Sequence, residues 1–219
     1  MANGHINTRI FIFNFDDAFL WHCGYWRLGY VASLSGVSML LDLLDRTLEL
    51  PLKSKVVTQP YLDFLTHQYQ LSHNGMHGIE HWLRVLINGR LIATQSGADI
   101  EVVEHFALLH DAQRQDEYRD IQHGGRAADF ATSLMGDWIH LNSTQMYQLT
   151  EACRYHSMGR LSKDVTIQTC WDADRLDLGR VGERPNPTYL GNKVARDNKF
   201  IKEALLRSKN RFVNYQFAR

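Results

Sequence analysis

A histidine and an aspartate stand side by side at the end of an apolar run, in the stretch HFALLHDAQRQDE at residues 105–117. The apolar run is typical of a buried helix, and a buried carboxylate is costly unless a cation or a partner charge offsets it. Imidazole nitrogens and carboxylate oxygens are both common metal ligands. His110 and Asp111 therefore predict a cation at the end of a buried helix.

A later stretch, WDADRLD, repeats the pattern of acidic residues among apolar ones. It offers Asp172, Asp174 and Asp177 on a helix expected over residues 165–178. Because two separate helices end in acids amid apolar residues, we expect them to share a cation between them.

The histidines are informative by their arrangement, since a lone histidine is more often a core or surface residue than a ligand. There are eleven, and nine of them fall between positions 67 and 156. His77 and His81 are four residues apart, so they share one face if their helix begins by residue 77. His123 stands just before one expected helix, and His156 stands at the end of another.

The main part of the chain is expected to be helical throughout. Pro51 and Pro60 flank LKSKVVTQ, which we interpret as the boundary between an N-terminal extension (1–50) and a main domain (51–219). No region shows sustained period-2 alternation between hairpin turns, which favours an all-α helical bundle. The expected helices span residues 61–71, 79–97, 98–111, 125–136, 142–157, 165–178 and 195–213. The last is basic and amphipathic. We expect it to pack on the domain with its lysine and arginine side chains solvated, and a lid over the substrate is the alternative.

The N-terminal extension carries no recognisable site motif. Residues 28–41 contain no charged side chain, yet they are too few to cross a bilayer, which takes about 20 apolar residues. They also lie far from the N-terminus and lack a basic segment ahead of them, unlike a secretory signal. We expect a packed or peripheral helix; a membrane-associated anchor and a misassigned start site stay open.

The net charge and the cysteine content limit which binding partners and which cellular compartment we expect. Lys+Arg and Asp+Glu are 24 each, so the net charge is zero and argues against nucleic-acid or anionic-membrane partners. The three scattered cysteines form no CxxC, which favours a reducing, cytoplasmic location. A homodimer is left open.

Three segments together resemble a known family. HGIEHWLRV, LLHD and DADRLD, in this order over roughly residues 60–180, are similar to the core motifs of the HD-domain superfamily of metal-dependent phosphohydrolases. The separations of 29 residues from His81 to His110 and 63 from Asp111 to Asp174 suit that pattern. The resemblance implies an all-helical bundle with a metal site between its central helices.

The resemblance also implies roles for individual residues. His81, His110, Asp111 and Asp174 match the metal ligands, Asp174 being preferred to Asp172 because it follows a small residue and precedes Arg-Leu. His77 matches a histidine beside the substrate phosphate in a nucleotide-hydrolysing branch, so Asp111 and His77 are the expected catalytic residues. Asp177 is left open between orienting a ligand and pairing with Arg180 on the surface.

His123 and His156 resemble the additional ligands of binuclear members, in which the residue matching Asp111 bridges two ions. We therefore expect one divalent transition metal (Mn, Fe, Ni, Co or Zn rather than Ca) and leave a second ion open. Guanidinium groups match phosphate well. The candidate phosphate donors are Arg84, Arg126 and Arg175, with Arg160 also considered, and a solvated surface charge is the alternative for each.

The resulting hypothesis is a metal-dependent phosphohydrolase that uses a metal-activated water on a small phosphorylated metabolite, with a nucleotide as the favoured substrate. A di-iron oxygenase of the same superfamily and a non-catalytic nucleotide-binding module are the alternatives.

Overall fold

The computed structural model describes residues 54–210. Within them the chain forms seven α-helices and three short 3-10 helices and no strand, which confirms the predicted all-α fold. The extension at 1–50 and residues 211–213 of the predicted last helix lie outside the described residues. The α-helices are α2 (Gln59–Gln68), α3 (Ile79–Ser96), α4 (Ile100–Leu109), α5 (His123–Ser133), α6 (Ser143–Tyr155), α7 (Val165–Arg175) and α8 (Asn198–Asn210). No helix in this part of the chain has the length and apolarity needed to cross a membrane.

Side-chain caps fix where several helices begin. Asp99, Asn142 and Asp164 each accept hydrogen bonds from the first backbone N–H groups of α4, α6 and α7, which otherwise lack partners. Asn142 and Gln145 form a reciprocal capping box. Helix α3 ends at Gly97, whose φ of 78° is a left-handed conformation that suits glycine. These local signals place the helix ends within a few residues of the predicted bounds.

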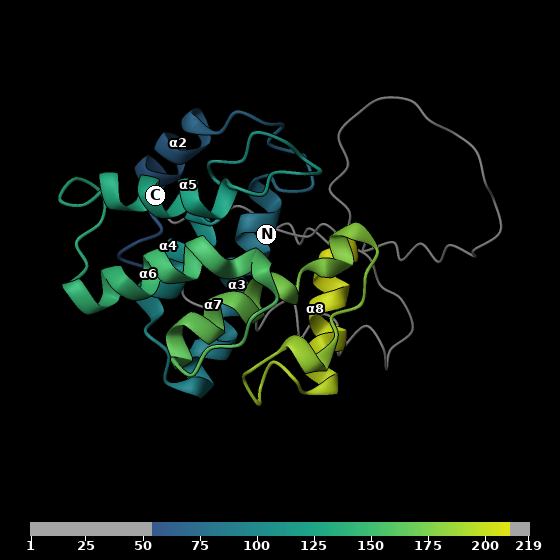
Figure 1. Cartoon of the computed structure of the whole chain (residues 1–219). Helices are drawn as coiled ribbons and strands as arrows, with labels where there is room; N and C mark the ends of the chain where they lie inside the picture. The colour runs from purple at the N-terminus through teal and green to yellow at the C-terminus, as the bar shows by residue number, and fades with distance from the viewer. Residues whose placement is uncertain (1–53, 211–219) are drawn as a thin grey trace, which may run out of the picture. The chain divides into compact units, whose positions relative to one another are not determined.

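Helix α3 lies at the centre of the bundle, where it packs against both α4 and α7 (Figure 1). Helix α4 also packs on α6, and α5 packs on α6. The α3–α4 approach is close at Gly89, because a Cβ there would lie 2.5 Å from Val103 Cγ1. This arrangement brings the end of α4 and the length of α7 to the same side of α3.

Helix α8 packs on the domain as predicted, against α3 and the 3-10 turn η2 (Leu178–Val181). A second small core of buried residues joins these elements; it contains Ile92, Leu176, Leu190, Ala195, Phe200, Ile201 and Ala204. The expectation that all its basic side chains are solvated is wrong for Arg207. That guanidinium is buried and donates two hydrogen bonds to Asn88 Oδ1, at 3.1 and 2.9 Å.

Candidate metal centre

Four potential ligand atoms, from α3, from α7 and from the residues that directly follow α4, converge in one place. His81 Nε2 lies 3.0 Å from His110 Nε2, 3.4 Å from Asp111 Oδ2 and 3.5 Å from Asp174 Oδ1. His110 Nε2 lies 3.5 Å from Asp111 Oδ2 and 3.8 Å from Asp174 Oδ1. Ligand atoms about 2.0–2.2 Å from one ion lie about 2.8–3.6 Å apart in tetrahedral or octahedral geometry. All of these separations except the 3.8 Å between His110 Nε2 and Asp174 Oδ1 lie in this range, so the first group, defined by these four atoms, fits one divalent transition metal after a small adjustment.

A second group forms on the other side of Asp111. Its members are Asp111 Oδ1, His123 Nε2 and His156 Nε2; the two nitrogens are 2.8 Å apart and lie 3.5 and 3.7 Å from the oxygen. The two carboxylate oxygens of Asp111 thus face different groups, as in a bridging ligand. The close approach depends on Gly124, since a Cβ there would lie 2.7 Å from Cys153 O, against the end of α6.

Hydrogen bonds at the other ring nitrogen orient all four imidazoles. The Nδ1 atoms of His81, His110, His123 and His156 face, in that order, Asp177 Oδ2 at 2.7 Å, Phe106 O at 3.2 Å, Asp120 O, and Cys153 O at 2.8 Å. Because each partner is an acceptor, Nδ1 carries the proton and Nε2 presents a lone pair to its group. The Nε2 lone pairs of the first two histidines, 3.0 Å apart, repel each other unless a cation lies between them. The same holds for the Nε2 lone pairs of the other two, 2.8 Å apart. The donor set therefore fits metal ions.

The charge states of the buried groups agree with this donor set. Burial raises the pKa of Asp111, but neighbouring His110, His156 and His81 outweigh burial and hold it well below its ordinary value. The pKa of Asp174 is lowered in the same way. Burial lowers the pKa of His110 to about 3, so its ring is neutral and can act as a ligand. For His156, nearby Asp111 outweighs burial and raises the pKa, which shows that this carboxylate favours positive charge beside it.

Asp177 orients the first histidine. Its carboxylate is almost fully buried and accepts hydrogen bonds from His81 Nδ1, Arg84 Nε and Ser208 Oγ, each at 2.7 Å. Burial raises the pKa of Asp177, but the bonds from His81 and Arg84 outweigh it and lower the pKa. The alternative of a surface acid does not hold, although Arg180 Nη1 lies 4.0 Å away. Asp177 thus connects His81 to Ser208 of α8.

Asp172 has a structural role. Its buried carboxylate accepts hydrogen bonds from Gln168 Nε2 at 2.7 Å, Gly191 N at 2.9 Å and Asn192 N at 2.7 Å. These bonds attach the loop before α8 to α7. The structure therefore places Asp174, rather than Asp172, with the predicted ligands.

A cavity of about 830 Å³ opens onto both groups. Its wall contains Arg114, Arg175, Arg180 and Arg184, with Glu183 as the one acid apart from Asp111 and Asp174. Met158, Leu178 and Tyr189 supply apolar surface. The cavity is therefore rich in guanidinium groups, which suits an anionic ligand.

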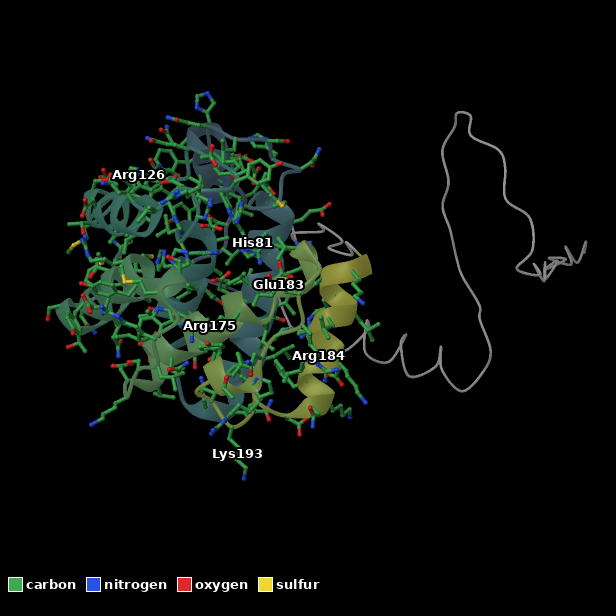
Figure 2. All side chains as sticks on the ribbon, turned by 45° about the vertical axis from the view of Figure 1, so that its right-hand side comes forward. His81, Arg126, Arg175, Glu183, Arg184 and Lys193 are labelled. Carbon is green, nitrogen blue, oxygen red and sulfur yellow. The ribbon has the colours of Figure 1, made fainter. Side chains whose placement is uncertain are left out.

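The predicted phosphate donors do not all reach this cavity. Arg175 lines it. Arg84 is instead buried against Asp177, and Arg126 donates to Gln113 O at 3.1 Å and pairs with Asp120. In Figure 2, Arg126 lies apart from Arg175. Arg160 also does not line the cavity; its guanidinium stacks 4.7 Å from the centre of a tyrosine ring.

His77 does line the cavity, although α3 begins only at Ile79. Its ring lies 6.1 Å from that of His81, and its Nδ1 bonds to Glu117 Oε2 at 2.8 Å. Trp82 Nε1 donates to the backbone oxygen of His77 at 2.9 Å and holds the segment in place. His77 and His81 therefore both lie near the first group because of the segment that precedes α3, and not because they share one face of a helix.

Sequence reasoning did not single out several cavity residues. Arg114 lies three residues after Asp111, in the turn that follows α4. This short separation from a predicted ligand is the one sequence signal that could have identified Arg114 as a cavity residue. Arg180, considered only as a surface partner of Asp177, lies in η2, and Glu183 and Arg184 come from the segment after it. In the view of Figure 2, Arg175, Glu183 and Arg184 all lie below His81.

Comparisons with known proteins agree with this description of the fold. No family model and no curated protein matches the chain. The crystal structure of a predicted HD superfamily hydrolase from an uncultured Thermotogales bacterium is similar, with a TM-score of 0.52 and 24% sequence identity over 68% of this chain and 83% of that chain. At this identity the likeness concerns the fold. The described part of the chain thus shares the all-helical fold of that predicted HD superfamily hydrolase, and the predicted histidines and aspartates gather between its central helices.

Proposed function

We propose that this protein is a metal-dependent phosphohydrolase of the HD superfamily that acts on a small phosphorylated metabolite, with a nucleotide as the favoured substrate. One observation carries the proposal. Four imidazole Nε2 atoms and two carboxylates converge in two groups at an arginine-lined cavity. The likeness to the crystal structure of a predicted HD superfamily hydrolase supports it through the fold.

The two groups supply the ligands. His81, His110 and Asp174 would hold a first ion with Asp111, and Asp111 would share a second with the pair His123 and His156 in the second group. A divalent ion there lowers the pKa of a water molecule and polarises a phosphoryl oxygen. The chain contributes the orientation of each ring, because every Nδ1 is held by an acceptor.

The cavity wall supplies groups that suit a phosphorylated substrate. Arg175 is buried, donates from Nη1 to Tyr189 O at 2.6 Å, and its Nη2 has no hydrogen-bond partner among the described residues. Arg175 also lines the cavity, so its guanidinium is placed to meet a phosphoryl group bound there. The apolar surface of Met158, Leu178 and Tyr189 suits the base of a nucleotide.

His77 is suited to move a proton at the leaving group. Its Nδ1 is held by Glu117, so Nε2 is the ring nitrogen left for the substrate. Burial lowers the pKa of His77 and the neighbouring Asp111 opposes that effect. A positioned imidazole that protonates a leaving oxygen contributes about 10²–10⁴-fold to rate in other enzymes.

The experiment is an activity panel of phosphomonoesters, nucleotides and cyclic nucleotides, run with Mn, Fe, Co, Ni and Zn. The expected result is metal-dependent phosphate release that is lost in Asp111→Ala and retained in Asp172→Asn, a buried carboxylate outside both groups. A metal-loaded protein that releases no phosphate from any member would contradict the proposal. Stoichiometric iron with a mixed-valence spectroscopic signal would then favour the di-iron oxygenase.

A further inference from the structure

Arg114 lies against the second group and not the first. Its Nη1 is 3.4 Å from Asp111 Oδ1 and 3.3 Å from His123 Nε2. The side chain is 7% exposed, and its Nε donates to Asp116 O at 3.2 Å. The guanidinium therefore contacts two of the three atoms that would bind a second ion.

The turn after α4 builds this contact into the chain. The backbone N–H of Arg114 donates to Asp111 O at 3.1 Å, so the arginine follows directly from the bridging aspartate. Guanidinium does not lose its proton in proteins. The guanidinium charge of Arg114 therefore lies beside Asp111 Oδ1.

The first group differs in its charge. Asp174 belongs to it alone, and within residues 54–210 no lysine or arginine forms an ion pair with Asp174. The second group has only one oxygen of the shared Asp111, and that oxygen already contacts Arg114. An ion in the first group thus meets an available carboxylate, whereas an ion in the second must compete with a guanidinium.

We propose that Arg114 sets the order of metal binding: the first group takes its ion tightly, and the second takes its ion weakly because that ion must displace Arg114 from Asp111 and His123. This inference rests on the proposed function, which supplies the two metal sites. Arg114 also lines the cavity, so the displaced guanidinium stays within reach of a bound phosphate. Substrate and second ion are then expected to bind together.

The test is a titration of metal-free protein with Mn²⁺, followed by calorimetry and by elemental analysis of the metal content. In the wild type we expect two binding steps, with the second at least about tenfold weaker than the first. Arg114→Gln should tighten the second step by about tenfold or more, the scale of one charge-assisted hydrogen bond, and leave the first within about threefold. Arg114→Lys, which keeps the charge, should retain the weak second step.

Arg184→Gln is the matched control, because Arg184 lines the same cavity and forms no ion pair with either group among the described residues. Arg184→Gln should change the affinity of both binding steps little. If the effect of Arg114→Gln came only from removing one positive charge, Arg184→Gln would shift the affinities by as much. Thermal unfolding checks that each variant is folded.

Two equally tight steps in the wild type, or a second step unchanged in Arg114→Gln, would overturn the inference while leaving the proposed function intact. Failure of the wild type to bind any ion would overturn the proposed function itself.

Discussion

Replacing Asp177 by asparagine should weaken the first metal site although Asp177 touches no ion. The substitution removes the charge from a buried carboxylate that accepts three hydrogen bonds, each 2.7 Å long, from His81, Arg84 and Ser208. His81 Nδ1 would lose its charged acceptor, and loss of such a partner typically costs about 10–100-fold in metal affinity. We expect that range for the tighter ion.

The same substitution should lower stability. Arg84 is 4% exposed, and its Nη1 already has no hydrogen-bond partner among the described residues. Breaking a buried ion pair lowers the free energy of unfolding by about 3–5 kcal/mol. Because the amide oxygen of asparagine can still accept one hydrogen bond, we expect the lower end of that range, about 3 kcal/mol. For a domain of this size about 3 kcal/mol corresponds to a decrease of about 6–12 °C in Tm.

The assay combines calorimetric Mn²⁺ titration with thermal unfolding of the metal-free protein. Asp172→Asn is the matched control: it is a buried carboxylate five residues earlier, with hydrogen bonds to Gln168 and Asn192 and to no ligand histidine. It should lower Tm and leave metal affinity unchanged. The reasoning would be refuted if Asp177→Asn kept wild-type metal affinity, or if Asp172→Asn weakened it equally.

Three further outcomes follow from the site. Asp111→Ala should abolish phosphate release while helicity by circular dichroism is retained, because it removes the carboxylate shared by both groups; a folded variant with normal turnover would disprove the assignment. The double variant His123→Ala/His156→Ala should lower the metal content from two ions to one by elemental analysis and reduce turnover by orders of magnitude, since two ions stabilise both the attacking and the leaving oxygen; a wild type that binds one ion at saturating metal would contradict this. A chain that begins at Leu52 should keep metal and activity, because every ligand lies downstream; a folded truncated protein without turnover would show that the N-terminal segment contributes to the site.

Local patterns in the sequence determined the helices. Apolar spacing near 3.6 residues, the caps Asp99, Asn142 and Asp164, and Gly97 act within one or two turns, so they can be recognised without knowing the fold. The burial of charged side chains on apolar helices predicted a cation near His110 and Asp111. The other predicted ligands, His81, Asp174, His123 and His156, were implied by the resemblance of the sequence motifs to the HD-domain superfamily.

The tertiary structure alone decided how these parts meet. Arg84 looked like a phosphate donor, yet it pairs with Asp177, 93 residues away. Arg207 looked solvated, yet it bonds to Asn88 across 119 residues. The division of the two Asp111 oxygens between the groups, and the contact of Arg114 with one of them, depend on how α4, α5 and α6 are packed. Local periodicity carries no information about such distant pairings, because each is fixed by the packing of several helices at once and not by the residues on either side.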